Sequence, residues 1–293
     1  MKPEVLFADR KPRSWVVLDI ESAVIDTVGH RRFLAMERFV PRDDQPPRRG
    51  YQRRDDPLLT PRWPFQTIVA ASVMLLIEHE NGNIDVGQFT TLSAPDLSER
   101  QIVEGVLAVL ANAPSGTELA SWAGMVHDVP MLALAAQRHG LTLPSGWRWL
   151  GFGGNDPVRH LDLARTTTGG FKMKPVHLAE VLASLDIPAK ITAPAFSVAR
   201  LIYEQQWDTV QEAVENDVIS TALLLAHWRQ LHDGRASLDV VKDRILRRVE
   251  ELRDGRGYVP ALREYRARLQ AARKAAATAS MAALAPWLEQ DAA

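Results

Sequence analysis

Two carboxylates end an apolar stretch near the start of the chain. In SWVVLDIES, residues 14–22, Asp19 and Glu21 follow a run of apolar residues. Successive side chains of a strand point to opposite faces, so both acids project the same way, about 6 to 7 Å apart, and Ile20 points to the core. Like charges this close raise each other's pKa unless a cation lies between them. The pair is compatible with a divalent metal site and equally with a solvated strand end.

Two further acids stand out by their position. Asp128, in SWAGMVHDVPML, lies where a short strand gives way to a helix, and it could be a simple helix cap. Asp217, in ENDVISTALLLAHW, falls on the apolar face of a predicted helix together with Val214 and Thr221. An ionised carboxylate on that face is costly unless something neutralises it. We therefore rank a metal above an arginine salt bridge as the partner of Asp217.

The composition limits the chemistry. The chain has no cysteine, which excludes disulfides, thiolate metal sites and cysteine nucleophiles. Oxygen ligands without sulfur suit Mg²⁺ or Mn²⁺. A hydrophobic content of 46% and a charged content of 24% are those of an ordinary globular protein. No apolar run is long enough for a membrane span, and the N-terminus lacks the apolar core of a secretory signal, so we expect a cytoplasmic protein.

The order of predicted elements indicates the fold class. Strands are predicted at 15–20, 67–77, 84–92 and 118–122, with a short extended segment at 160–163. Helices are predicted at 97–112, 129–138, 176–185, 197–206 and 209–231. The polar break 79–83 is a hairpin turn, which makes the first three strands an antiparallel meander. A parallel strand follows the first helix. The sequence therefore predicts an α/β protein with an RNase H-like mixed sheet flanked by helices.

Two regions differ in character from this core, which we place at 13–233. Residues 29–62 are rich in Arg, Asp and Pro and are predicted to form a long surface loop; within 41–62 there are six Arg against four Asp. Residues 237–288 are predicted to be a helical C-terminal appendage with helices at 238–253 and 261–277. Residues 41–62 and the basic tail, residues 229–274, could contact a polyanion, although solvated surface is the plainer interpretation. The appendage could dimerise, pack back on the core or contact a longer substrate.

Three motifs in order carry a family resemblance. DIES, then G-x-x-x-D-x-P-x-L from Gly124, then END-V-x-x-T-x-L-L from Glu215, resemble the DEDD superfamily of 3′–5′ exonucleases. The chain looks most like the predicted exonucleases related to the proofreading domain of family-B DNA polymerases, over about 13–232. HLDL at 160–163 resembles a further family feature. The resemblance implies hydrolysis of phosphodiester bonds at nucleic-acid 3′ ends, DNA in preference to RNA, with DNA repair as a setting.

The resemblance also implies roles for individual residues. Two Mg²⁺ or Mn²⁺ ions would be held by Asp19, Glu21, Asp128 and Asp217. Substrate contacts would come from Ile20, Ser22, Trp122, Gly124 and Asp162, although core packing is the plainer role for Trp122. We further expect nucleotide bases to stack on Trp63 and Phe65. The phosphate backbone would be bound by the basic tail and by Arg48, Arg49, Arg53 and Arg54.

Two departures from the family pattern affect this interpretation. The tyrosine expected four residues before the last Asp is Ala213, and the alternative histidine position holds Glu212. Glu212, His127 and His160 are the candidate substitutes for the missing base. The Asn that usually precedes the motif glycine is Ala123. A catalytically degenerate module that binds nucleic acid or a protein partner is therefore the alternative function, and a purely structural scaffold is a third. The sequence does not indicate the oligomeric state.

Overall fold

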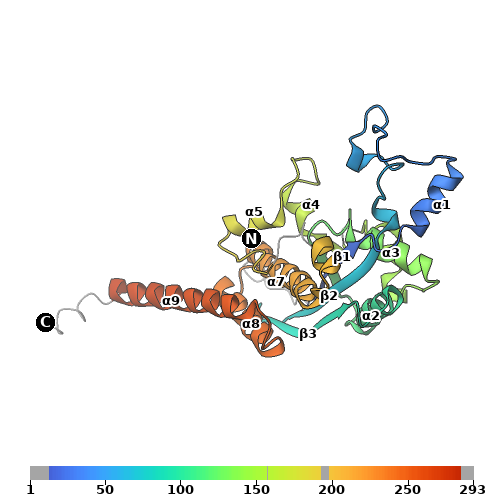
Figure 1. The fold of residues 1–293 in the computed structure, drawn as a ribbon. Helices are drawn as coiled ribbons and strands as arrows, with labels where there is room; N and C mark the ends of the chain where they lie inside the picture. Colours follow the sequence, from blue (N-terminus) through green and yellow to red (C-terminus); the bar gives the residue numbers. More distant parts are fainter. Residues whose placement is uncertain (1–12, 157, 193–197, 285–293) are drawn as a thin grey trace.

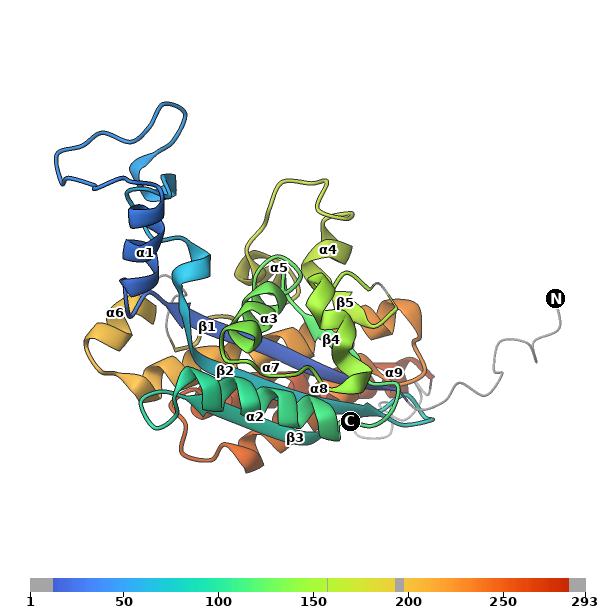
Figure 2. The same cartoon turned by 90° about the vertical axis from the view of Figure 1, so that its right-hand side faces the viewer.

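The sheet of the molecule is mixed and has five strands. The computed structural model describes residues 13–156, 158–192 and 198–284. The strand order is β3-β2-β1-β4-β5; the first three of these strands are labelled in Figure 1 and all five in Figure 2. The strands are β1 (Ser14–Ala23), β2 (Thr67–Glu78), β3 (Ile84–Ser93), β4 (Glu118–Ser121) and β5 (His160–Asp162). β1, β2 and β3 pair antiparallel, and β1, β4 and β5 pair parallel. The predicted fold class is thereby confirmed.

Helices cover both faces of β1, the central strand. Trp15 and Val17 pack into the core under α7 (Trp207–His232), while Val16 and Leu18 pack into a second core under α2 (Glu99–Asn112) and α3 (Asp128–Arg138). Figure 2 shows these helices on either side of the sheet. Because side chains alternate along a strand, Asp19 continues the row of Trp15 and Val17 and therefore lies on the α7 side.

α2, predicted at 97–112, begins at Glu99 behind a capping box. The Ser98 hydroxyl accepts a hydrogen bond from the Gln101 amide, and the Gln101 side chain accepts one from the Ser98 amide. This capping box satisfies two amides that have no partner within the helix. The apolar face of α2, which includes Ile102, Val106 and Leu110, is buried against the sheet.

The N-terminal segment corrects a prediction. Residues 29–62 were expected to form a long surface loop, but α1 (Val28–Met36) forms there and buries His30 and Leu34. The remainder folds around Asp56, which is fully buried and accepts hydrogen bonds from the amides of Arg48 and Leu58. This nine-residue helix was missed because its stability comes from tertiary contacts and not from a strong local pattern.

The C-terminal helices pack on the core. α8 (Leu238–Leu252) buries Val241, Ile245 and Val249 in the same cluster as α7 and β3. α9 (Val259–Leu284) begins buried, but its side chains are exposed from 270 to 281, and this half extends away from the body (Figure 1). Of the three alternatives for this region, packing back on the core is the one observed for 238–269. The division into 13–233 and 237–288 stays a prediction, and 285–288 lie outside the described residues.

Short helices complete the chain. They are α4 (Leu163–Thr167), α5 (Leu178–Ser184), α6 (Val198–Tyr203), and 3-10 turns at Arg53–Asp55, Trp63–Phe65 and Ser145–Phe152. α5 and α6 match the predictions at 176–185 and 197–206, although Ser197 is outside the described residues. α4 and the turn at 145–152 were not predicted. None of the helices in the described part of the chain is long and apolar enough to cross a membrane.

Candidate metal centre

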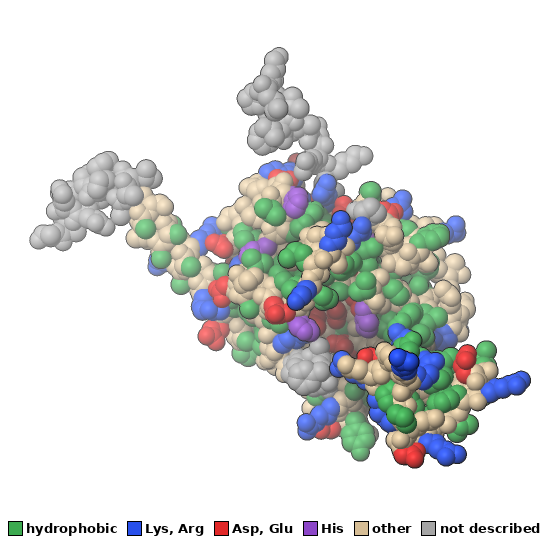
Figure 3. Space-filling model, turned by 90° about the horizontal axis from the view of Figure 1, so that it is seen from above, with side chains coloured by type: hydrophobic (Ala, Val, Ile, Leu, Met, Phe, Trp, Pro, Cys, Tyr) green, Lys and Arg blue, Asp and Glu red, His purple; other side chains and the backbone are tan. Residues whose placement is uncertain are grey.

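Three of the four predicted acids bring their oxygens together. Asp19 and Glu21 on β1 and Asp217 on α7 each offer a carboxylate oxygen, and these atoms lie within 4.8 Å of one another. The alternation of β1 turns both of its acids to the α7 side, and α7 covers that side with the face that carries Asp217. Seen from above, acidic side chains lie in a hollow in the middle of the molecule, with histidines beside them (Figure 3).

The fourth acid approaches from the other side of β1. Asp128 is 4% exposed at the first position of α3, and its charge raises the pKa of Asp19. The N-cap of α3 is His127 and not Asp128, and the Asp128 carboxylate lies 3.0 Å from Nδ1 of His127. The plain helix-cap interpretation of Asp128 is therefore wrong. Asp128 is near the cluster without completing the group of mutually close oxygens.

The electrostatics of the cluster favour a cation. Burial raises the pKa of Asp19 well above its usual value, and the charges of Asp128 and Asp217 raise it further. Burial, followed by the charge of Asp217, raises the pKa of Glu21 to about 7. Burial likewise raises the pKa of Asp217. Because a divalent cation would stabilise all of these carboxylates in their ionised form, the donor set fits a hard ion held by oxygen.

A tightly built loop, 122–127, positions Asp128. A side chain at Gly124 would lie 2.7 Å from Cβ of Ser121, so only glycine fits there. Asp162 is 2% exposed, and its two oxygens accept hydrogen bonds from the amides of Ala123 (3.1 Å) and Met125 (3.0 Å). Asp162 therefore holds the loop in place. Contact of Asp162 or Gly124 with a substrate stays a prediction.

Ala123 occupies a backbone conformation that suits another residue. Its φ is +58°, in the left-handed region that asparagine adopts more readily than alanine. The Asn expected before the motif glycine would therefore relieve backbone strain here. The departure at Ala123 has a conformational consequence in addition to any loss of a polar side chain.

The structure separates the three candidates for the missing base. His160 is 4% exposed and uses both ring nitrogens, with Ser121 Oγ at 2.7 Å and the Gly154 carbonyl at 3.0 Å. The Glu212 carboxylate accepts a hydrogen bond from the Gly257 amide at 2.5 Å. His127 is half exposed, and its hydrogen bond with Asp128 raises its pKa. His127 is thus the candidate beside the acids, while Ala213 supplies no polar group.

Lys190 is a residue that the sequence analysis missed. Its ammonium donates a hydrogen bond to Asp217, and its charge partly offsets the rise that burial causes in the pKa of Asp217, Glu21 and Asp19. The backbone of Lys190 has a φ of +50°, which bends the chain before α6. A lone lysine in the apolar stretch IPAKITAPAF, 187–196, is the signal that could have pointed to it.

The predicted substrate residues take mixed places. Ile20 is 3% exposed and packs in the core, and Trp122 is partly buried against the α7-side core. Ser22 Oγ donates to Gln66 Oε1 at 2.8 Å. Phe65 packs edge-on against His30, whereas Trp63 is 43% exposed. These contacts account for Ile20 and Trp122 structurally, and their roles toward a substrate stay predictions.

The fold and the carboxylate cluster define a class of protein: an α/β protein with acids gathered beside the central strand of a mixed sheet. The family model described as "Predicted 3'-5' exonuclease related to the exonuclease domain of PolB" matches residues 61–267. The chain belongs to this family. The matched residues include Asp128, Lys190 and Asp217, and they extend through α8 into α9. Asp19 and Glu21 precede the match and join the other acids through the pairing of β1 with β2 and β4.

A solved structure gives a more distant likeness. The family B DNA polymerase from the hyperthermophilic archaeon Pyrobaculum calidifontis is similar over 83% of this chain, with 16% sequence identity and a TM-score of 0.46. The similar part is 29% of that polymerase, so this chain spans less than a third of its length. No curated protein matches the chain.

Proposed function

We propose that the protein is a metal-dependent 3′–5′ exonuclease that removes nucleotides from single-stranded nucleic-acid 3′ ends, DNA in preference to RNA. The observation that carries the proposal is the approach of three carboxylate oxygens, from Asp19, Glu21 and Asp217, to within 4.8 Å of one another. This approach occurs in a chain of the predicted PolB-related exonuclease family. Exonuclease domains of this kind use divalent metals, and the donor set suits Mg²⁺ or Mn²⁺.

The residues of the cluster would have different roles in metal binding and catalysis. Asp19, Glu21 and Asp217 would hold the metal, and Asp128 would hold a second ion directly or through water. Two divalent ions bound there would lower the pKa of an attacking water and stabilise the leaving 3′-oxygen. Lys190 offers a positive charge to the phosphate whose negative charge grows during the attack. His127, whose side chain is half exposed, would accept or relay a proton once a cation neutralises Asp128.

A direct assay tests the proposal. A single-stranded oligonucleotide labelled at its 5′ end is incubated with the protein and Mn²⁺ or Mg²⁺. We expect a ladder of products that shortens from the 3′ end and disappears with EDTA. DNA and RNA of the same sequence are compared to test the preference.

Two variants make the assay specific to the cluster. Asp19→Asn should abolish the ladder, because the carboxylate is lost with little change in shape. Asp186→Asn is the matched control, since Asp186 has an 81% exposed side chain and is not one of the clustered acids. Products that persist in Asp19→Asn, or that shorten from the 5′ end, would refute the proposal.

A second candidate function rests on a specific observation. Ala213 is 6% exposed and offers no proton acceptor, and Lys190 already gives Asp217 a positive partner. Both features favour a degenerate module that binds nucleic acid or a protein partner without cutting. Oligonucleotide binding by wild-type protein, with no product at any Mn²⁺ or Mg²⁺ concentration, would select this alternative.

A further inference from the structure

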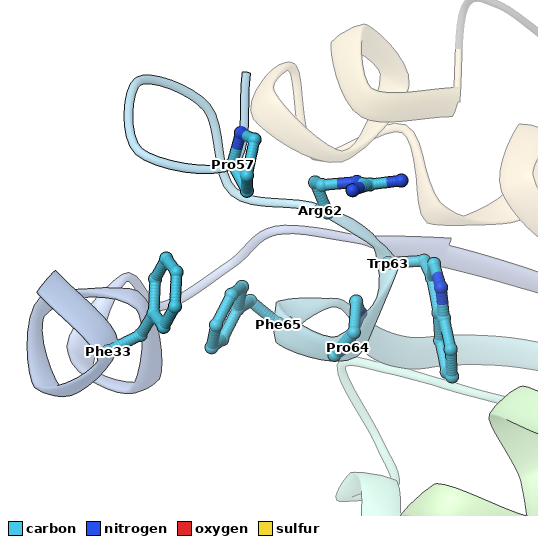
Figure 4. Close-up of a pocket in the computed structure, with 6 residues that line it drawn as sticks. All are labelled: Phe33, Pro57, Arg62, Trp63, Pro64 and Phe65. Atoms are coloured by element: carbon cyan, nitrogen blue, oxygen red, sulfur yellow. The ribbon is translucent and has the colours of Figure 1, made fainter. Parts of the chain in front are cut away.

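An apolar pocket lies between α1, which follows β1, and the segment that leads into β2. It has a volume of about 310 Å³ and is formed by α1 and residues 57–65. Phe33, Pro57, Pro64 and Phe65 supply its apolar wall, and Arg62 and Trp63 complete the lining (Figure 4). Small-molecule sites begin at roughly this volume. None of the clustered acids lines the pocket, so it is separate from the proposed metal centre.

The back of the pocket is held by aromatic contacts. The ring centroids of Phe33 and Phe65 are 5.8 Å apart, and that of His30 lies 5.3 Å from that of Phe65 in an edge-on arrangement. His30 Nε2 also lies 2.9 Å from the Pro57 carbonyl oxygen. These contacts join α1 to the 57–65 segment. The wall is therefore formed before any ligand arrives, which reduces the entropy lost on binding.

The pocket is tied to the strand that carries the acids. Gln66, directly after Phe65, accepts a hydrogen bond from Ser22, the neighbour of Glu21. In the sheet, Thr67 pairs with Ala23, and Ala70 pairs with Glu21. Thr67 and Ala70 are three residues apart, about 10 Å along a strand. A nucleic-acid strand that ends at the acid cluster would reach the pocket within a few nucleotides.

The charge around the pocket suits a polyanion. Residues 41–62 contain six Arg and four Asp. Arg48 is bound to Asp56, Arg53 to backbone carbonyls, and Arg54 lies 3.7 Å from Asp55. Within the described part of the chain, the exposed side chain of Arg62 has no hydrogen-bond or ion-pair partner. It is therefore a guanidinium available for a phosphate.

Arg62 stands beside an aromatic face. Trp63 is 43% exposed. In Figure 4 the side chains of Arg62 and Trp63 both extend away from Phe33. An exposed indole can stack on a base, and a neighbouring guanidinium without an acidic partner can bind the phosphate of the same strand.

We propose that this pocket is a nucleotide subsite for single-stranded nucleic acid. A base a few nucleotides 5′ of the cut stacks on Trp63 against the apolar wall, and Arg62 binds a neighbouring phosphate. The direction of the strand rests on the proposed exonuclease function. Because stacking uses the face of a base, the subsite accepts any sequence, and affinity rises with strand length until the pocket is filled.

Binding of oligothymidylates of increasing length, from about three to about fifteen nucleotides, tests the subsite by fluorescence anisotropy. Ca²⁺ replaces Mg²⁺ or Mn²⁺, so that binding is measured without cutting. We expect Trp63→Ala to weaken the long strand by roughly tenfold and Trp63→Phe to change it little. Arg62→Gln should make the plot of log K against log salt shallower by about 0.7. The shortest strand should bind equally to all variants.

Controls separate the subsite from general effects. Arg159→Gln, directly before β5 and outside both basic regions, should leave the salt dependence unchanged, because its side chain already lies 3.7 Å from Asp156. Thermal unfolding checks the fold of Trp63→Ala, and Arg62→Gln gives an independent reading because Arg62 is exposed. Equal affinities of wild-type and variant proteins for the long strand would overturn the subsite, as would an equal loss on the shortest strand.

The outcomes also distinguish the subsite from the proposed function. If the wild type cuts 3′ ends while both variants bind long strands normally, the exonuclease stands and the subsite falls. If the variants lose affinity only for long strands in a protein that cuts nothing, the subsite stands and the exonuclease falls. A wild-type protein that neither binds nor cuts any strand contradicts both.

Discussion

Glu215 and Asp217 stand two residues apart on α7 and have opposite surroundings. Glu215 is fully buried, and its carboxylate accepts hydrogen bonds from Tyr258 Oη (2.8 Å) and Arg256 (3.1 Å), with Arg253 at 3.3 Å. Asp217 has Lys190 as its positive partner and faces Asp19 and Glu21. The first acid joins α7 to the chain around 253–258, and the second lies among like charges.

The difference separates a structural acid from an acid suited to ligand binding. Burial and the Glu215 carboxylate raise the pKa of the Tyr258 hydroxyl, which therefore stays protonated and donates its hydrogen bond. Around Asp217, by contrast, burial raises the pKa values of several acids together. A site whose carboxylates lack sufficient positive charge is destabilising by itself, and a bound cation would relieve it.

The largest expected effect comes from Asp217→Asn. We expect the exonuclease rate to fall by about 10³-fold or more, because metal-assisted catalysis supplies several kcal/mol at such sites. Thermal unfolding in EDTA should change little, because the substitution also removes a like charge from the cluster. Initial rates on a 5′-labelled single strand, at matched folded fractions, provide the measurement. A rate within tenfold of wild type would contradict the assignment of Asp217 to the site.

Glu215→Gln should give the reverse pattern. The substitution leaves the guanidinium groups of Arg253 and Arg256 without their buried carboxylate partner. We expect this loss to lower the free energy of unfolding by about 3 kcal/mol. The exonuclease rate per folded molecule should be preserved. Urea unfolding followed by circular dichroism measures the loss. A stable but inactive Glu215→Gln protein would mean that the two acids on α7 do not divide these roles.

Lys190→Ala should have an intermediate effect on catalysis. Loss of a positive charge near the reacting phosphate is expected to lower kcat by roughly 10- to 100-fold. Lys190→Arg should recover part of the rate because it retains the charge. Steady-state kinetics with Mn²⁺ distinguishes this role from simple binding, which would raise KM and leave kcat unchanged. Equal kcat values for Lys190→Ala and wild type would show that Lys190 only compensates charge in the metal-free protein.

The smallest effect is a pH dependence of stability due to Glu21, whose side chain is partly exposed. Its pKa rises from 4.5 in the unfolded chain to about 7 in the folded protein, so the folded state binds more protons between these values. In EDTA, stability should therefore fall as pH rises from 4.5 to 7. The Glu21→Gln protein should show a smaller decline in stability over this pH range. Addition of Mn²⁺ to the wild-type protein at pH 7 should restore the stability that it loses in EDTA. Parallel melting-temperature profiles of the two proteins would contradict the prediction.

Sequence patterns determined the positions of the acids along each element. The alternation in β1 placed Asp19 and Glu21 on one face, and the apolar period of α7 placed Asp217 on its buried side. The capping box at Ser98 and the meander of β1, β2 and β3 were likewise predictable. These features depend on the local geometry of strands and helices, which repeats every few residues and can be read from the chain.

Only the tertiary structure decided which side chains meet. Lys190 lies 27 residues from Asp217 in sequence, and its bend has a positive φ that no local pattern encodes. Contacts between distant segments also decide three other features: the hydrogen bonds of both His160 nitrogens, the formation of α1 against Phe65 and the packing of α8 on β3. Such contacts form only when the core is closed, because each stabilises its segment too weakly to appear in the local sequence pattern.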